Sequence, residues 1–105
     1  MKLTQQQIDT FNREGWVFLP EQFSAEEIEV LRHEAANVLG SNREEIWREK
    51  NGAPRTAFAA HKYNEAFAIL GRHPRMIGPV EQAFGERVYM HQYKINAKAK
   101  FDGDV

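Results

Sequence analysis

The chain has 105 residues, a formal net charge of -1 and no cysteine. This length suits one domain or a piece of one, because domain sizes peak at about 100–150 residues. The balanced charge argues against nucleic-acid and anionic-membrane partners, and the lack of cysteine excludes disulfide scaffolds and thiolate metal sites. Without a secretory signal or a long apolar run, the composition predicts a soluble, cytoplasmic protein.

A short helix is predicted at the start of the chain. Thr4 and Gln7 fit a capping box, and Gly15 suits the end of the helix. The apolar run at 16–19 then ends at Pro20. Such a short apolar run before a proline favours a strand.

The second helix has a stronger start signal. Ser24 and Glu27 fit another capping box, and Phe23 is placed to pack on Ile28 as a hydrophobic staple. Gly40 marks the end of the helix. One apolar stripe, which must cover another element, consists of Ile28, Leu31, Ala35, Val38 and Leu39.

The charged segment that follows allows two interpretations. Asn51-Gly52 is a strong turn signal, which would pair residues 46–50 with residues 54–60 in a hairpin. The alternative extends a helix through residues 43–50. The sequence does not decide between the hairpin and the helix.

Two further helices are predicted beyond the hairpin. Asn64 can cap a short helix over residues 65–70, with Gly71 as its stop. Pro74 suits the first turn of the next helix, which ends before Gly85. The apolar residues expected to face inward from that helix are Met76, Ile77, Val80 and Phe84.

The segment RVYMHQYKIN, residues 87–96, is interpreted as a strand with two different faces. One face would carry Val88, Met90, Gln92, Lys94 and Asn96, and the other Tyr89, His91, Tyr93 and Ile95. A row of polar side chains on a strand that is otherwise apolar enough to be buried has two explanations. Either the polar side chains have a function, or they form hydrogen bonds with buried backbone groups. No repeat or linker divides the chain, so residues 1–105 are expected to form one α+β unit.

The residues that could bind a metal are scattered along the chain. The four histidines are His33, His61, His73 and His91, and none shows H-E-x-x-H or His-x-Asp spacing. We interpret His33 as a surface residue and His73 as a residue at a helix start. For His61 and His91 we expect hydrogen-bonded positions in the core.

No catalytic or metal-ligating residue is assigned from the motifs. Asp102 and Asp104 flank Gly103, a pattern typical of a turn. The chain has no glycine-rich phosphate loop and no G-x-S-x-G nucleophile elbow. On motifs alone, these residues do not make a complete enzyme.

The order of these segments carries a resemblance to a known family. WVFLP at 16–20, FSAEEI at 23–28, and YMHQYKIN followed by FDGDV resemble the N-terminal part of the phytanoyl-CoA dioxygenase family, which includes the ectoine hydroxylases. The resemblance covers essentially the whole chain and is strongest at 10–39 and 87–104. It implies an oxidoreductase, a non-haem dioxygenase that depends on Fe(II) and 2-oxoglutarate.

The resemblance also implies a fold and the position of the iron. The family has a double-stranded β-helix of the jelly-roll type, and this chain would supply its N-terminal helices and first strands, with the barrel incomplete. Two histidines and a carboxylate hold the iron in relatives, and they follow a stretch that resembles FDGDV. The iron ligands would therefore lie outside this chain, and the 105 residues alone are expected to be inactive.

Four residues acquire expected roles through the resemblance. In ectoine hydroxylases the matching strand lines the cavity, which implies that Gln92 contacts the substrate and Asn96 contacts 2-oxoglutarate. Phe58 matches an aromatic residue that borders the 2-oxoglutarate pocket. Lys94 shares the predicted face of Gln92 and Asn96, and it would add a cation for a carboxylate of the substrate.

One departure from the family pattern bears on the substrate. In phytanoyl-CoA hydroxylases a lysine directly follows the I-N pair, whereas this chain has Ala97 there and Lys98 one position later. This disfavours an acyl-CoA and favours a small polar molecule, such as an amino acid or a natural-product intermediate. Halogenases of the same superfamily remain an alternative to hydroxylases, because the residue that separates them lies outside the chain.

A second hypothesis belongs to a different class. The chain could be a self-contained small α+β binding or interaction domain without metal or catalysis. An orphaned half-barrel would be recognised by unpaired strand edges and an exposed apolar face. The sequence gives no indication of the oligomeric state.

Overall fold

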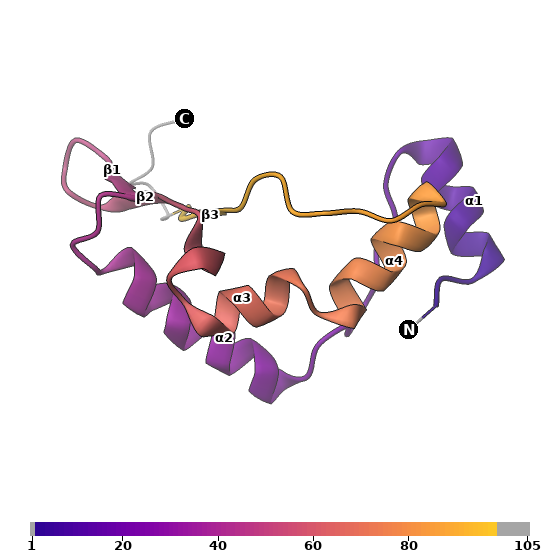
Figure 1. Cartoon of the computed structure of the whole chain (residues 1–105), viewed down its shortest axis with the longest axis horizontal. Helices are drawn as coiled ribbons and strands as arrows, with labels where there is room; N and C mark the ends of the chain where they lie inside the picture. Colours follow the sequence, from indigo (N-terminus) through magenta and orange to yellow (C-terminus); the bar gives the residue numbers. More distant parts are fainter. Residues whose placement is uncertain (1, 99–105) are drawn as a thin grey trace.

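The computed structural model describes residues 2–98 and shows an elongated molecule, with the sheet at one end and α1 beside α4 at the other (Figure 1). Its elements in chain order are α1 (Gln5–Glu14), α2 (Ala25–Leu39), β1 (Ile46–Arg48), β2 (Pro54–Phe58), the short 3-10 helix η1 (Ala60–Lys62), α3 (Glu65–Gly71), α4 (Pro74–Phe84) and β3 (Lys94–Asn96). The fold is α+β with a small sheet in the order β1-β2-β3.

Both predicted capping boxes are confirmed. At α1, the backbone N–H of Gln7 donates to Thr4 Oγ1 at 3.1 Å, and the Thr4 N–H donates to Gln7 Oε1 at 2.9 Å. At α2, the Glu27 N–H donates to Ser24 Oγ at 3.1 Å, and the Ser24 N–H donates to Glu27 Oε1 at 2.8 Å. These bonds satisfy N–H groups that a helix start otherwise leaves unpaired.

The predicted hairpin is confirmed, and the alternative helix over residues 43–50 is wrong. Ile46 on β1 lies opposite Ala57 on β2, and Ala57 lies opposite Ile95 on β3, with both pairs of strands antiparallel. The turn is fixed by Asn51, whose Oδ1 accepts the Ala53 N–H at 3.0 Å. It also uses a left-handed backbone (φ +88°) that suits Gly52.

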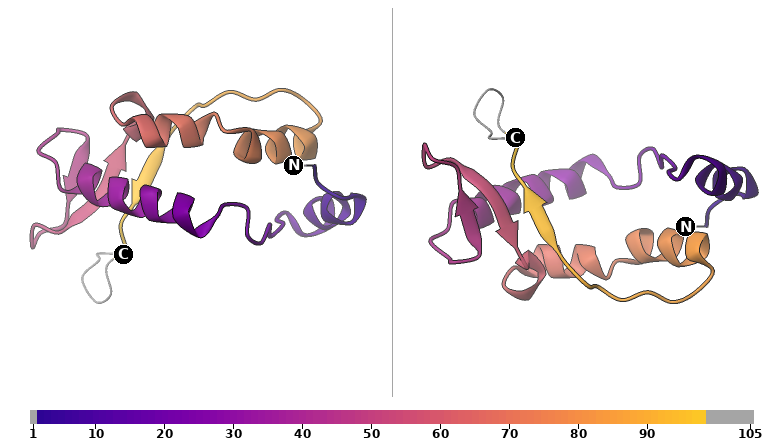
Figure 2. Two further views of the ribbon diagram at one scale, coloured as in Figure 1. Left: turned by 90° about the horizontal axis from the view of Figure 1, so that it is seen from below. Right: turned by 90° about the horizontal axis from the view of Figure 1, so that it is seen from above.

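The core lies against one face of the sheet. Its buried residues come from α2, β1, β2, η1 and α3: Val38, Ile46, Ala57, Ala60 and Phe67. Figure 2 shows α2 and α3 on either side of β3. The apolar stripe of α2 packs against this core from Leu31 onward, whereas Ile28 is 40% exposed and lies outside it.

Two predicted strands are absent or shorter than expected in residues 2–98. Residues 16–19 are extended but join no sheet, and Trp16 and Phe18 are 62% and 72% exposed. The strand predicted over residues 87–96 is limited to β3. The physical reason is the same for both, because a strand needs a neighbour to pair with its N–H and C=O groups.

The predicted bounds of the last two helices are close to those observed. Asn64 caps α3 by accepting the Phe67 N–H at 3.1 Å, although the helix includes Gly71. Helix α4 starts at Pro74 and ends before Gly85, as predicted. The prediction that its apolar side faces inward is wrong for Met76, Val80 and Phe84, which are 42%, 41% and 58% exposed.

Helix α4 is held to the start of the chain rather than to the sheet. Gln82 Nε2 donates to the Leu3 carbonyl at 3.0 Å, and its Oε1 accepts the Leu3 N–H at 2.6 Å. The rings of Phe11 and Phe84 lie 6.2 Å apart. Within the described part of the chain, no helix is both long and apolar enough to cross a membrane.

Candidate functional site

The candidate site lies on the face of the sheet that points away from the core. Side chains alternate between the two faces of a strand. Because Ala57 and Ile95 face the core, their neighbours in each strand face the opposite way. This face, called the open face below, carries Trp47, Thr56, Phe58, Lys94 and Asn96.

Asn96 is positioned by a residue that the sequence analysis did not single out. Thr56 lies directly opposite Asn96 in the sheet, and its Oγ1 donates to Asn96 Oδ1 at 3.0 Å. Thr56 is only 8% exposed, while Asn96 is exposed. The Thr56 hydroxyl occupies Oδ1, and the side-chain amide nitrogen of Asn96 has no hydrogen-bond acceptor among residues 2–98.

Phe58 forms an aromatic wall on the same face. The Trp47 ring meets it edge-on, with centroids 4.8 Å apart, and Lys94 Nζ lies 5.6 Å from its centroid. Lys94 lies directly opposite Phe58 across β2 and β3. Trp47 was also missed, although the Asn51-Gly52 turn and period-2 spacing place it on the side of Phe58.

Gln92 lies just before β3 and is exposed. It lines a pocket of about 340 Å³ together with Phe58, His61, His91 and Lys94. The structure thus brings three of the four predicted site residues around one pocket. Asn96 does not line this pocket, but lies further along β3 on the open face, beside Thr56.

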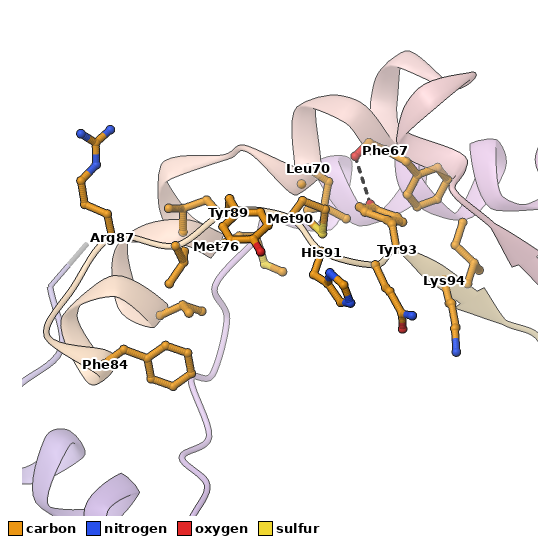
Figure 3. A pocket seen from close by; sticks show the side chains of 16 residues that line it. Phe67, Leu70, Met76, Phe84, Arg87, Tyr89, Met90, His91, Tyr93 and Lys94 are labelled. Carbon is orange, nitrogen blue, oxygen red and sulfur yellow. Dashed lines mark hydrogen bonds between the residues drawn. The ribbon is translucent and has the colours of Figure 1, made fainter.

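A larger apolar groove of about 770 Å³ runs between α3, α4 and the segment that leads to β3 (Figure 3). In Figure 3 Tyr93 points toward Phe67, whereas His91 and Lys94 point the other way. Tyr93 Oη donates to the Phe67 carbonyl at 3.0 Å, and burial raises the pKa of this tyrosine. Tyr93 therefore serves the packing of α3.

The histidines match their predicted environments in part. His33 is exposed, and His73 Nδ1 accepts the Arg75 N–H at 3.1 Å at the start of α4. His61 is half-buried and stacks on Tyr93 at 4.8 Å, but its buried Nδ1 has no hydrogen-bond partner among the described residues. The core position expected for His91 is wrong, because this residue is exposed.

Among residues 2–98, no three His, Asp or Glu side chains come together in a group that could hold a metal ion. Asp102, Asp104 and the FDGDV stretch lie outside the described residues. Within residues 2–98, Asn96 and Lys94 offer an amide and a cation on the open face, and the His, Asp and Glu side chains do not form an iron site.

Comparison with known proteins gives consistent relatives, although no family model matches the chain. The chain is 36% identical over 106 residues to the ectoine dioxygenase of Halomonas elongata, covering 96% of this chain and 32% of that protein. It is 32% identical over 94 residues to the L-proline trans-4-hydroxylase of Streptomyces griseoviridis, covering 89% of this chain and 35% of that protein.

Solved structures agree with these relatives. EctD from S. alaskensis with bound Fe superposes with a TM-score of 0.82 at 27% identity, over 90% of this chain and 35% of that one. The same protein with 2-oxoglutarate and 5-hydroxyectoine gives a TM-score of 0.81. The chain spans about a third of the length of the curated relatives it matches. Over most of its length the chain is therefore similar to the N-terminal portion of ectoine dioxygenases and of a proline hydroxylase.

Proposed function

We propose that this chain is the N-terminal segment of a non-haem Fe(II)/2-oxoglutarate-dependent dioxygenase that hydroxylates a small polar molecule, such as an amino acid or a natural-product intermediate. The observation that supports this most is the register of β2 and β3, which pairs Thr56 with Asn96 and Phe58 with Lys94 on the open face. The helices and the small sheet would form the first part of a double-stranded β-helix.

Asn96 would bind 2-oxoglutarate through its side-chain amino group. The Thr56 hydroxyl donates to Asn96 Oδ1 and holds the amide in one orientation, so its N–H groups point to a ligand without further ordering. A carboxylate accepts such N–H bonds well. Phe58 would border the same ligand with its ring and keep water from one side of it.

Gln92 and Lys94 would bind the substrate. Both side chains line the pocket beside Phe58, where an amide offers donors and an acceptor and an ammonium offers a cation. This combination suits a small molecule that carries a carboxylate and other polar groups. The case against an acyl-CoA rests on the sequence, in which Ala97 stands where phytanoyl-CoA hydroxylases have a lysine.

The iron would be held by residues outside the described part of the chain. When bound, iron and 2-oxoglutarate supply the oxidising chemistry. The role proposed for the present residues is to bind and orient the two organic molecules. A cytoplasmic location, a single unit over residues 1–105 and the lack of nucleic-acid and membrane partners remain predictions from the sequence.

A chimera tests the proposed function. This chain would be followed by the part of the Halomonas elongata ectoine dioxygenase that lies beyond its match. We expect the folded chimera to consume 2-oxoglutarate in an Fe(II)-dependent reaction that ectoine stimulates. A chimera that has native-like circular dichroism and binds Fe(II), but does not consume 2-oxoglutarate, would contradict the proposal.

The chain by itself provides the matching control. Under anaerobic conditions, titration of the 105-residue chain with Fe(II) should show no stoichiometric site, because the described histidines and carboxylates do not converge. A site of micromolar affinity or better in the isolated chain would show that the iron ligands had been wrongly placed outside it.

A further inference from the structure

The pocket beside Phe58 has basic side chains in its lining and no acidic one. Its volume is about 340 Å³, and four of the residues that line it are His61, Lys62, His91 and Lys94. No Asp or Glu among residues 2–98 lines it. The whole chain has 15 Asp or Glu residues and 14 Lys or Arg residues, so this one-sided lining departs from the charge balance of the protein. This cavity is called the basic pocket below.

The basic side chains come from two segments that the backbone holds together. Ala59 has a left-handed backbone (φ +56°), and its N–H donates to the Tyr93 carbonyl at 2.8 Å. This conformation is costly for alanine, so the surrounding structure must hold the turn in place. The turn brings η1, which carries His61 and Lys62, to the segment that leads into β3. The His61 ring stacks on Tyr93 at 4.8 Å, so packing fixes its position at the pocket wall.

The two lysines of the basic pocket have no carboxylate partner within the described part of the chain. The ion pairs among residues 2–98 each join an arginine to a glutamate, and none includes Lys62 or Lys94. Lys94 Nζ instead lies 5.6 Å from the centroid of the Phe58 ring. In Figure 3 Lys94 points to the same side as His91. Like charges that share one cavity repel each other, and an anionic ligand removes that repulsion.

We propose that the basic pocket binds a small molecule with two anionic groups, such as an acidic amino acid, and that this molecule is the substrate. The inference rests on the proposed function and narrows its substrate class. Gln92 and Lys94 would hold one carboxylate. Lys62 would hold the second, with the imidazole groups of His61 and His91 as further hydrogen-bond donors.

The competing occupant is 2-oxoglutarate, which is also a dianion. Asn96, the residue proposed to bind it, does not line the basic pocket. It lies further along β3, opposite Thr56. The two organic molecules would therefore have separate places along the same strand, and the basic pocket is left to the substrate.

Binding of L-aspartate and L-asparagine to the 105-residue chain tests the preference for two anionic groups. The two amino acids have nearly the same size and shape, but only aspartate has a second carboxylate. In NMR titrations of the isotope-labelled chain at constant ionic strength, we expect L-aspartate to shift the amides of residues 58–62 and 90–94 saturably. L-Asparagine should bind at least about fivefold more weakly, because it loses one charge-assisted contact.

Two lysine variants separate the basic pocket from the overall charge of the chain. Lys62→Gln and Lys50→Gln each remove one positive charge, but Lys50 lies in the hairpin turn and does not line the pocket. Both side chains are exposed, so neither change should unfold the protein. We expect Lys62→Gln to reduce the preference for L-aspartate to less than about twofold, and Lys50→Gln to leave it unchanged.

Competition in the chimera distinguishes the substrate from 2-oxoglutarate. L-Aspartate would be titrated by calorimetry into the anaerobic chimera with Fe(II), in the presence and absence of saturating 2-oxoglutarate. We expect L-aspartate to bind in both conditions. If 2-oxoglutarate abolished this binding, the basic pocket would be the site of the co-substrate and the proposal would be wrong.

Three results on the chain itself would also overturn the proposal. The first is equal binding of the two amino acids, and the second is an equal effect of the two lysine variants. The third is no saturable shift at residues 58–62 and 90–94 up to about 50 mM L-aspartate. A chimera that consumes 2-oxoglutarate would leave the proposed function standing in each case. An inactive chimera that still prefers L-aspartate would contradict the proposed function but not the anion site.

Discussion

The two ends of the molecule differ in how well their apolar side chains are covered. At the sheet end, Val38, Ala57 and Phe67 are 5%, 0% and 6% exposed. At the other end, Phe18 and Phe84 are 72% and 58% exposed. Both ends carry amphipathic helices with well-formed starts, so local helix signals do not explain the difference.

The difference comes from the number of layers. At the sheet end, α2 and α3 both pack on a sheet, so the apolar stripe of each helix has a surface to cover (Figures 1 and 2). At the other end, α4 contacts α1 on one side, and its Met76 and Val80 line an open groove. Apolar surface stabilises a fold only where a second layer removes it from water.

The largest expected effect on stability is the difference between truncating Phe67, at the sheet end, and truncating Phe84, at the other end. Phe67→Ala should lower the free energy of unfolding by about 3–5 kcal/mol, because Phe67 is buried in the core. Phe84→Ala should cost less than about 1 kcal/mol, because its ring is more than half exposed. Urea denaturation of the two variants measures both values, and equal losses would remove the distinction between the ends.

The same contrast exists within a single helix. Leu31→Ala should cost about 2 kcal/mol or more, since Leu31 packs on the core, whereas Ile28→Ala should cost less because Ile28 is 40% exposed. Glu29→Ala, on the polar face, should do almost nothing. If denaturant midpoints ranked Glu29→Ala as the most damaging of the three, the observed orientation of α2 would be wrong.

The open face is an exposed surface at the well-packed end, and binding measurements on the chimera probe it. Asn96→Ala should weaken 2-oxoglutarate binding by about 1–3 kcal/mol, because a ligand oxygen loses its donor. Gln92→Ala should act mainly on the substrate, by raising its KM or by uncoupling 2-oxoglutarate consumption from hydroxylation. Ile95→Ala, on the core side, should affect folding first.

Isothermal titration with 2-oxoglutarate and coupled turnover assays measure these effects, with folding checked for every variant. Suppose that the Asn96 and Gln92 variants are folded and unchanged in both assays, while the Ile95 variant is folded but inactive. The functional face of the strand would then be the opposite one.

A smaller effect is expected at the start of α2. Ser24→Ala should lower the free energy of unfolding by about 0.5–2 kcal/mol, because it removes the acceptor of the Glu27 N–H. Ser24→Asp keeps an acceptor at the same place and should restore most of the loss. Thermal denaturation compares the two variants, and an equal loss in both would mean that the side-chain acceptor is not what stabilises the start of α2.

The smallest effect concerns the contact that joins the two ends. The Arg75 guanidinium at the start of α4 donates to Glu27 at the start of α2, and with the Ser24 N–H it lowers the pKa of Glu27 from 4.5 to about 2. A lowered pKa means that the contact stabilises the fold fully above pH 4.5 and is lost as the pH falls toward 2.

Glu27→Gln isolates this contribution, because it keeps the capping acceptor but removes the charge. Denaturation midpoints of both proteins, measured from pH 5 to pH 2, should converge as the pH falls. A constant difference over this range would show that the ion pair does not stabilise the fold. Because both side chains are more than a third exposed, salt should reduce the difference as well.

Local chemistry explains most of what could be predicted from the sequence. The capping pairs Thr4–Gln7 and Ser24–Glu27, and the turn at Asn51-Gly52, depend on residues only a few positions apart, so the sequence contains both partners of each interaction. The resemblance to the oxygenases also came from the sequence, through the order of its short segments. The alternative helix at 43–50 does not form, because residues 46–48 pair with β2 in the hairpin.

The ends of the helices and the polar face of β3 follow from near neighbours in the chain, because caps, turns and the alternation of side chains are local. Long-range packing, in contrast, sets the Thr56–Asn96 hydrogen bond and the contact of Trp47 with Phe58, and it leaves residues 16–19 outside the sheet. These outcomes depend on which distant segments come together, and a strand or an apolar helix face is completed only when a second element lies against it.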